Sequence, residues 1–168
     1  MAKKTTVKAV ALKYGTVGGE ATTPLMGVLK GLTISQDEPD STEIEAEFYD
    51  SPFDIFYDGK PVTFQFELAN YDLADLPALF GGSTSSDTFE GPAAATTTEH
   101  SWQLEFGRGN YALYLYKGLT VGTIKKDEDG ALNFSVTITA LTHPVTTGTG
   151  NDAVTVDRMY KIIGTAPA

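Results

Sequence analysis

Residues 42–82 restrict the fold of this chain more than any other segment. Charged and apolar residues alternate strictly from Glu43 to Phe48. Because successive side chains of a strand point to opposite faces, the alternation predicts a β-strand. One face of that strand would carry three carboxylates, those of Glu43, Glu45 and Glu47. The other face, with Ile44 and Phe48 on it, would turn toward a core.

Two further signals follow the alternation at once. The segment 53–68 has the pattern of two paired strands, broken at Asp58-Gly59. The segment 72–80 has helical spacing and ends at a Gly-Gly pair, which predicts one or two helical turns packed across a sheet. The apolar residues that share one face of this helix are Leu73, Leu76 and Phe80.

The rest of the chain favours strands, so we expect a single, mainly β domain over residues 1–168. Further strands are predicted by apolar or alternating runs at 6–12, 28–34, 101–106, 111–119, 120–126, 131–141 and 159–163. Segments rich in Gly, Ser and Thr that have few apolar anchors predict flexible loops at 15–24, 83–98 and 142–156.

Charge and cysteine content exclude several function classes. The chain has 168 residues with 12 basic and 22 acidic side chains, a formal net charge of −10. Such a surface repels nucleic acid and anionic lipid. The absence of cysteine excludes disulfides, thiol catalysis and cysteine-ligated metals. We find no export signal and no apolar stretch of membrane-spanning length, and therefore expect synthesis in the cytoplasm and no membrane partner.

The acidic side chains are unevenly distributed. Nine of them lie between Gly31 and Gly59, where there is no Lys or Arg. One interpretation is a solvated strand face that deters edge-to-edge aggregation. The other is a repulsive wall for a polyanion.

The order of these motifs resembles the major tail tube proteins of tailed bacteriophages. The motifs are the acidic alternating strand, a D-x-P-F-x-I step at 50–55, an F-x-F-E strand at 64–67 and the D-L-x-x-L-x-x-L-F-G-G helix end at 72–82. The later runs 114–118 and 132–136 are similar to the closing hairpin of that family. Prophage elements and related injection machines use the same tube.

The resemblance implies an antiparallel β-sandwich or barrel-like subunit with one short flanking helix. It implies hexameric rings that stack into a tube in the virion tail, contacts with other tail proteins, and DNA that passes without specific binding. It implies no enzyme activity, no cofactor and no metal. We expect Glu43, Glu45 and Glu47 to line an acidic lumen. The segment 83–98, with Ser83, Thr88, Phe89 and Thr98 as candidate contacts, is expected to reach the next ring.

Other chemistry receives less support from the sequence. His100 and His143 are the only histidines, and each lies in or beside a predicted loop, where packing is the commoner role. No nucleotide-binding, nucleophile-elbow or zinc-protease motif is present. The alternative function is a carbohydrate-binding or adhesin-like β-sandwich module. Its stacking surface would come from the aromatic residues Trp102, Tyr111, Tyr114 and Tyr116.

Overall fold

The computed structural model describes residues 9–25, 28–44, 54–93, 97–106, 111–126 and 128–164. Antiparallel strands dominate these residues, and the single α-helix among them is short. The predicted fold class, mainly β and sandwich- or barrel-like with one short helix, is confirmed at this level. The strands are β1 (Ala9–Gly15), β2 (Thr23–Pro24), β3 (Val28–Gln36), β4 (Asp40–Ile44), β5 (Asp54–Asp58), β6 (Val62–Ala69), β7 (Ser83–Ser85), β8 (Thr88–Glu90), β9 (Thr98–Phe106), β10 (Tyr111–Lys126), β11 (Leu132–Leu141), β12 (His143–Thr147), β13 (Val154–Arg158) and β14 (Tyr160–Gly164). The helices are the 3-10 turns η1 (Leu73–Asp75) and η2 (Gly150–Asp152) and the α-helix α1 (Leu76–Phe80).

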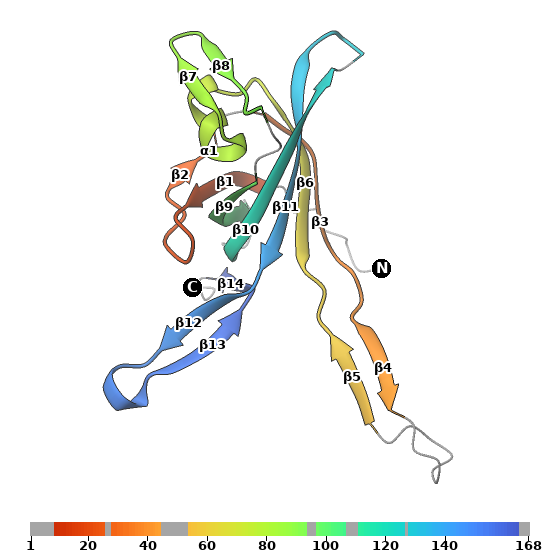
Figure 1. Ribbon diagram of the computed structural model, residues 1–168, viewed down its shortest axis with the longest axis vertical. Helices are drawn as coiled ribbons and strands as arrows, with labels where there is room; N and C mark the ends of the chain where they lie inside the picture. Colours follow the sequence, from red (N-terminus) through yellow and green to blue (C-terminus); the bar gives the residue numbers. More distant parts are fainter. Residues whose placement is uncertain are drawn as a thin grey trace, which may run out of the picture.

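One eight-stranded antiparallel sheet forms the centre of the molecule (Figure 1). Its order is β2-β1-β9-β10-β11-β6-β3, and β14 pairs with β10. The distal part of β10 pairs with β11 up to Lys117 opposite Leu141, whereas its first part pairs with β14 from Leu115 opposite Tyr160. Because β9 occupies the other side of β10, β11 and β14 lie one after the other along the same side.

The core lies on one face of this sheet, as the alternating patterns predict. In β6, Val62, Phe64, Phe66 and Leu68 are buried, and in β11 the buried apolar residues start at Phe134 and end at Ala140. Each fully buried large apolar side chain contributes about 1.5–3 kcal/mol to folding. The same period-two pattern leaves polar side chains such as Gln65 on the opposite face.

The helix covers the core face where the sequence predicts it, but its first turn differs from the expectation. Asp72 caps the segment by accepting a hydrogen bond from the backbone N–H of Ala74. Residues 73–75 then form a 3-10 turn, and the α-helix begins only at Leu76. Pro77 explains this start, because a residue without an N–H is tolerated only in the first turn of an α-helix. Gly81 ends the helix with a φ of 73°.

The predicted break between residues 119 and 120 is wrong, because β10 is one strand of 16 residues. Glycines at 118 and 122 resemble strand breakers in the sequence. In the structure both lie under rings: a Cβ at Gly118 would be 2.6 Å from Trp102, and one at Gly122 would be 2.0 Å from Phe80. The glycines therefore allow close packing on an unbroken strand. A bulge against β9 between Leu115 and Gly118 adds a local bend.

Three hairpins stand apart from the main sheet, each as a two-stranded sheet of its own. The β4–β5 hairpin continues the β3–β6 pair, and the β12–β13 hairpin leaves the line of β11 and β14. Both extend from the same end of the molecule (Figure 1). The β7–β8 hairpin lies beside α1 at the other end (Figure 1).

Two of these hairpins correct predictions of loops without regular structure. The segment 83–98 contains β7, β8 and the first residue of β9, and its Phe89 packs against the core. The segment 142–156 contains β12 and part of β13. Threonine-rich runs are good strand formers, and this preference outweighed the loop-like composition. The segment 15–24 is the connection between β1 and β2 and includes β2 itself.

Candidate functional site

The ends of the main sheet are formed by strands with a partner on one side only among the described residues. At one end this strand is β2, which has two residues, and its Pro24 weakens it as a pairing template. At the other end β14 pairs with β10 alone and β3 with β6 alone. The strand β14 is apolar and exposed: Ile162 has a relative exposure of 68%, and Tyr160 and Ile163 are also exposed. An exposed apolar edge strand is a template for pairing with another chain.

The two faces of the main sheet differ. The face that carries the core is overlaid by α1, which contacts β9 and β10, and by β7 next to α1. We call the opposite side of the sheet the open face. The side chains that alternate with core residues form this face. Thr33 of β3, Gln65 of β6 and Thr123 of the distal part of β10 are exposed there. This part of the open face carries Ser, Thr and Gln side chains together with the exposed Val121.

Three lysine–glutamate pairs lie on the open face. The Nζ of Lys13 is 2.7 Å from Oε1 of Glu105, and the Nζ of Lys117 is 3.2 Å from Oε2 of Glu99. Lys125 pairs in the same way with Glu67. Each of these side chains is about a third to a half exposed, so each pair contributes little to stability. Their consequence is electrostatic, because each of these three carboxylates has an ammonium group beside it.

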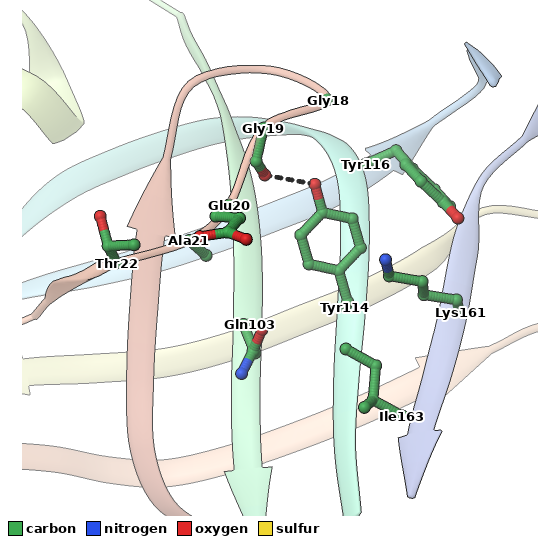
Figure 2. A pocket seen from close by; sticks show the side chains of 10 residues that line it. All are labelled: Gly18, Gly19, Glu20, Ala21, Thr22, Gln103, Tyr114, Tyr116, Lys161 and Ile163. Atoms are coloured by element: carbon green, nitrogen blue, oxygen red, sulfur yellow. Dashed lines mark hydrogen bonds between the residues drawn. The ribbon is translucent and has the colours of Figure 1, made fainter. Parts of the chain in front are cut away.

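A pocket of about 470 Å³ lies on the open face, under the connection between β1 and β2 (Figure 2). Tyr114 and Tyr116 form its floor, and the hydroxyl of Tyr114 donates a hydrogen bond to the carbonyl of Gly19 over 2.5 Å. Burial raises the pKa of the Tyr114 hydroxyl. The ammonium group of Lys161 lies 4.6 Å from the centre of the Tyr114 ring, where the ring face attracts a cation. The carboxylate of Glu20 lines the same pocket.

The two histidines have packing roles. The Nε2 atom of His100 is 2.6 Å from the carbonyl oxygen of Ala78 in α1, and Nδ1 is 3.3 Å from that of Gly15. His100 therefore connects the helix to β1 and β9. His143 stacks on the ring of Tyr116, with 6.5 Å between the ring centres.

The acidic row predicted from the sequence is described only at its first member. Glu43 lies on β4, and the backbone register places it opposite Ile55 of β5. Glu45 and Glu47 lie outside the described residues. The β4–β5 hairpin is separate from the main sheet.

The other predicted site residues are all described. Leu76 and Phe80 lie in the core and Leu73 packs against it, as the helical spacing predicts. Ser83 is in β7, and Thr88 and Phe89 are in β8. The hydroxyl of Thr98 donates a hydrogen bond to the carbonyl oxygen of Leu79, over 2.6 Å. The segment 83–98 is therefore attached to its own subunit by the packing of Phe89 and by the hydrogen bond of Thr98.

Burial limits the sugar-stacking alternative. Trp102 is completely buried, and Tyr114 and Tyr116 are buried in the small cluster that includes Ala21. Only Tyr111 of the predicted stacking set is exposed. These rings do not form the exposed aromatic platform that stacking on a sugar requires.

The sequence analysis missed the lysine–glutamate pairs of the open face and the exposed β14 edge. The partners of the first pair are 92 residues apart and those of the third are 58 apart, so only the strand order brings them together. The apolar run 162–163 was visible in the sequence. Its place at an edge depends on the β12–β13 hairpin, which precedes β14 and was not predicted from the sequence.

No protein-family model matches this chain, and no curated protein matches it. Among the described residues, no helix is long and apolar enough to cross a membrane. The same residues contain no group of three or more side chains able to hold a metal ion.

Proposed function

We propose that this chain is the structural subunit of a phage-type tail tube. In this proposal, subunits join side by side into rings of six, and the rings stack into a tube in the virion tail through which DNA passes without specific binding. Other tail proteins would contact the ends of the tube. The work of the protein is mechanical, and its partner is chiefly itself.

The observation that carries this proposal is the exposed, apolar edge strand β14. A sheet with one apolar edge and a different strand at its opposite end suits a head-to-tail contact, in which β14 of one copy meets the β1–β2 end of the next. Such a heterologous contact generates a ring when the rotation closes. Ring closure covers the edge that a lone subunit leaves exposed.

The hairpins suit contacts between rings. The β4–β5 and β12–β13 hairpins extend from one end of the molecule, beyond the main sheet (Figure 1). Val154 and Val156 on β13 are exposed apolar residues of the second hairpin. A neighbouring ring that covers them would bury apolar surface at about 25 cal/mol per Å². In this arrangement the two hairpins, rather than the β7–β8 hairpin, are the main stacking elements.

The test is assembly of the purified chain with a change at the edge. Negative-stain microscopy and sedimentation of the unchanged protein at rising concentration should show rings or tubes. Ile162→Lys places a charge on β14 and should leave folded single subunits, because charged side chains on an edge strand oppose pairing. Ala74→Lys adds the same charge at an exposed position of η1 and serves as the matched control.

The outcomes separate the proposal from its rivals. Rings or tubes from the unchanged protein and from Ala74→Lys, but not from Ile162→Lys, support it. A chain that stays a single subunit at every concentration, also in the presence of preformed tube ends, contradicts the proposed function. Tubes from Ile162→Lys that equal those of the unchanged protein remove β14 from the ring contact.

A further inference from the structure

We propose that the open face of the main sheet is the wall of the bore, and that its three lysine–glutamate pairs hold this wall near zero net charge as duplex DNA slides past. This inference rests on the proposed tube function and adds which surface meets the DNA and how that surface is charged. It differs from the sequence-based expectation of an acidic lumen built by Glu43, Glu45 and Glu47.

The two faces of the main sheet differ in whether they could line a channel. The covered face carries α1, η1 and the β7–β8 hairpin, which form a second layer on the sheet (Figure 1). If that layer faced the axis of a ring, it would fill the channel. The open face has short side chains on β6 and β11, such as Thr63, Ser135 and Thr137, and this part of it leaves room for a channel.

Three of the lysines on the open face are paired with glutamates. DNA carries one negative charge per about 1.7 Å of duplex axis, and a lysine without a counter-charge binds its phosphates in exchange for counterions. Lys13, Lys117 and Lys125 would hold DNA in this way if they stood alone. Each of them instead contacts a glutamate of a nearby strand. The wall therefore neither retains the polyanion nor opposes its entry.

The backbone register places Lys30 of β3 opposite Glu67. A further cation on this face is Lys161 in β14. Its ammonium group lies over the rings of Tyr114 and Tyr116, in the pocket that Glu20 also lines (Figure 2). The connection between β1 and β2 lies over this part of the face. Lys161 is thus set against aromatic rings and near a carboxylate.

The excess negative charge of the chain lies elsewhere. Nine of its acidic residues are in the segment 31–59, which includes the β4–β5 hairpin outside the main sheet. Asp87 and Glu90 belong to the β7–β8 hairpin beside α1. A tube built with the open face inward would have an acidic exterior and hairpin ends around a nearly neutral wall.

Cysteine labelling of assembled tubes tests which face is inside. The chain has no cysteine, so single substitutions give a clean background. Gln65→Cys reports on an exposed position of the open face, Asp87→Cys on the outer side beside α1, and Glu43→Cys on the acidic row. Each variant is assembled, then treated with a small maleimide or with a maleimide on a large polyethylene glycol that does not enter the bore.

The labelling pattern has a distinct meaning for each arrangement. We expect Gln65→Cys to react with the small reagent only and Asp87→Cys to react with both. If Gln65→Cys reacts with the large reagent, the open face is outside, and if it reacts with neither, the face is an interface; both results overturn the inference and leave the tube function standing. Size-limited labelling at Glu43→Cys but not at Gln65→Cys would establish the acidic row as the wall instead. Failure of the chain to form tubes overturns both proposals.

A charge experiment tests the second part of the inference. Combining Glu67→Gln, Glu99→Gln and Glu105→Gln removes the three carboxylates that pair with lysines on the open face, without changing its shape. The matched control, Asp37→Asn with Glu38→Gln and Asp87→Asn, changes the net charge equally at exposed positions off this face. The readout is the amount of a short fluorescent DNA duplex that pellets with tubes at low and at high salt.

We expect the open-face variant to retain about tenfold more duplex than the control at low salt, and to lose this excess at high salt because phosphate contacts are salt-dependent. Equal retention by the two variants overturns the proposal of a wall neutralised by ion pairs. Should the triple variant fail to assemble, Glu105→Gln alone removes the carboxylate beside Lys13 and must still retain more duplex than Asp37→Asn alone.

Discussion

Gly122 shows at the scale of one residue how closely the helix packs on the sheet. A Cβ atom at this position would lie 2.0 Å from the ring of Phe80, well inside any contact that real side chains make. Phe80 in turn stacks on Phe134 of β11, with 4.7 Å between the ring centres. The missing side chain of Gly122 therefore determines where the ring of Phe80 sits, and with it the position of α1 on the core face.

Gly122→Ala should destabilise the fold by about 1–3 kcal/mol, because overpacking forces shifts in a close-packed core. The measurement is the midpoint of urea unfolding followed by circular dichroism. Gly59→Ala is the control, since a Cβ there meets nothing within 4 Å, and its effect should stay within about 0.5 kcal/mol. Equal midpoints for Gly122→Ala and the unchanged chain would mean that α1 moves away from β10 without cost.

Tyr14 predicts how stability depends on alkaline pH. Burial, and then the nearby Asp75 carboxylate that accepts its hydrogen bond, raise the pKa of Tyr14 to about 12. The unfolded chain has the ordinary tyrosine pKa near 10. The folded state therefore holds this proton more tightly, and the corresponding stability is complete below about pH 10 and is lost as pH rises toward about 12.

Tyr14→Phe should flatten this part of the stability curve. Between about pH 9 and about pH 11.5, the free energy of unfolding of the unchanged chain should fall more than that of Tyr14→Phe, by on the order of 1–2 kcal/mol. Chemical denaturation at a series of pH values measures the difference, and other groups that titrate cancel in the comparison. Parallel curves for the two proteins would show that Tyr14 ionises in the folded state as readily as in the unfolded one.

At the scale of elements, β10 is the strand on which the second half of the chain is organised. β11 and β14 form one broken line along it, since Leu141 faces Lys117 and Tyr160 faces Leu115. The backbone N–H of Tyr116, between these two positions, donates to the carbonyl oxygen of Met159 over 3.3 Å. The β12–β13 hairpin is thus an insertion between β11 and β14, which pair with adjacent positions on the same side of β10.

Removing residues 142–158, so that Leu141 is followed directly by Met159, should give a folded chain. Leu141 lies opposite Lys117 and Tyr160 lies opposite Leu115, so one residue is needed opposite Tyr116 to join them. Met159 already occupies that place. We expect a β-sheet spectrum in circular dichroism with a cooperative unfolding transition, and loss of tube assembly if the hairpin joins rings. A chain that unfolds on this deletion would contradict the interpretation that β11 and β14 can join directly along β10. Shortening only the hairpin tip, by removing residues 149–152 so that Gly148 and Ala153 remain as a two-residue turn, is the control for effects of length.

The elements also show how far the sequence could predict this structure. The alternation in β6 and β11 was sufficient to predict these strands, and the helical spacing of 72–80 was sufficient to predict the helix, because each is a local pattern. The β7–β8 hairpin was not foreseen, since its turn uses Ser86 at a φ of 47° instead of the usual Gly or Asn. The open face could not be predicted at all: Lys13 meets Glu105 only through the pairing of β1 with β9, which no local pattern specifies.

For the whole molecule, charge and apolar edges act in opposite directions on self-association. The formal net charge of −10 makes subunits repel one another, while the apolar β14 edge favours contact. The hydrophobic contribution does not require low salt, whereas repulsion between exposed charges is screened. The screening length is about 10 Å at about 0.1 M salt and about 3 Å at about 1 M. Added salt should therefore weaken the repulsion between subunits and favour assembly.

We predict that the protein concentration needed for tube formation falls as sodium chloride is raised from about 0.05 M to about 0.5 M. Light scattering against concentration, checked by microscopy for tubes rather than aggregates, measures this threshold. Ile162→Lys separates specific assembly from salting-out, because it reduces the net charge and yet should stay unassembled at every salt concentration if β14 forms the ring contact. A threshold that rises with salt would indicate that ion pairs, rather than the apolar edge, hold neighbouring subunits together, and β14 would then lose its place as the main contact.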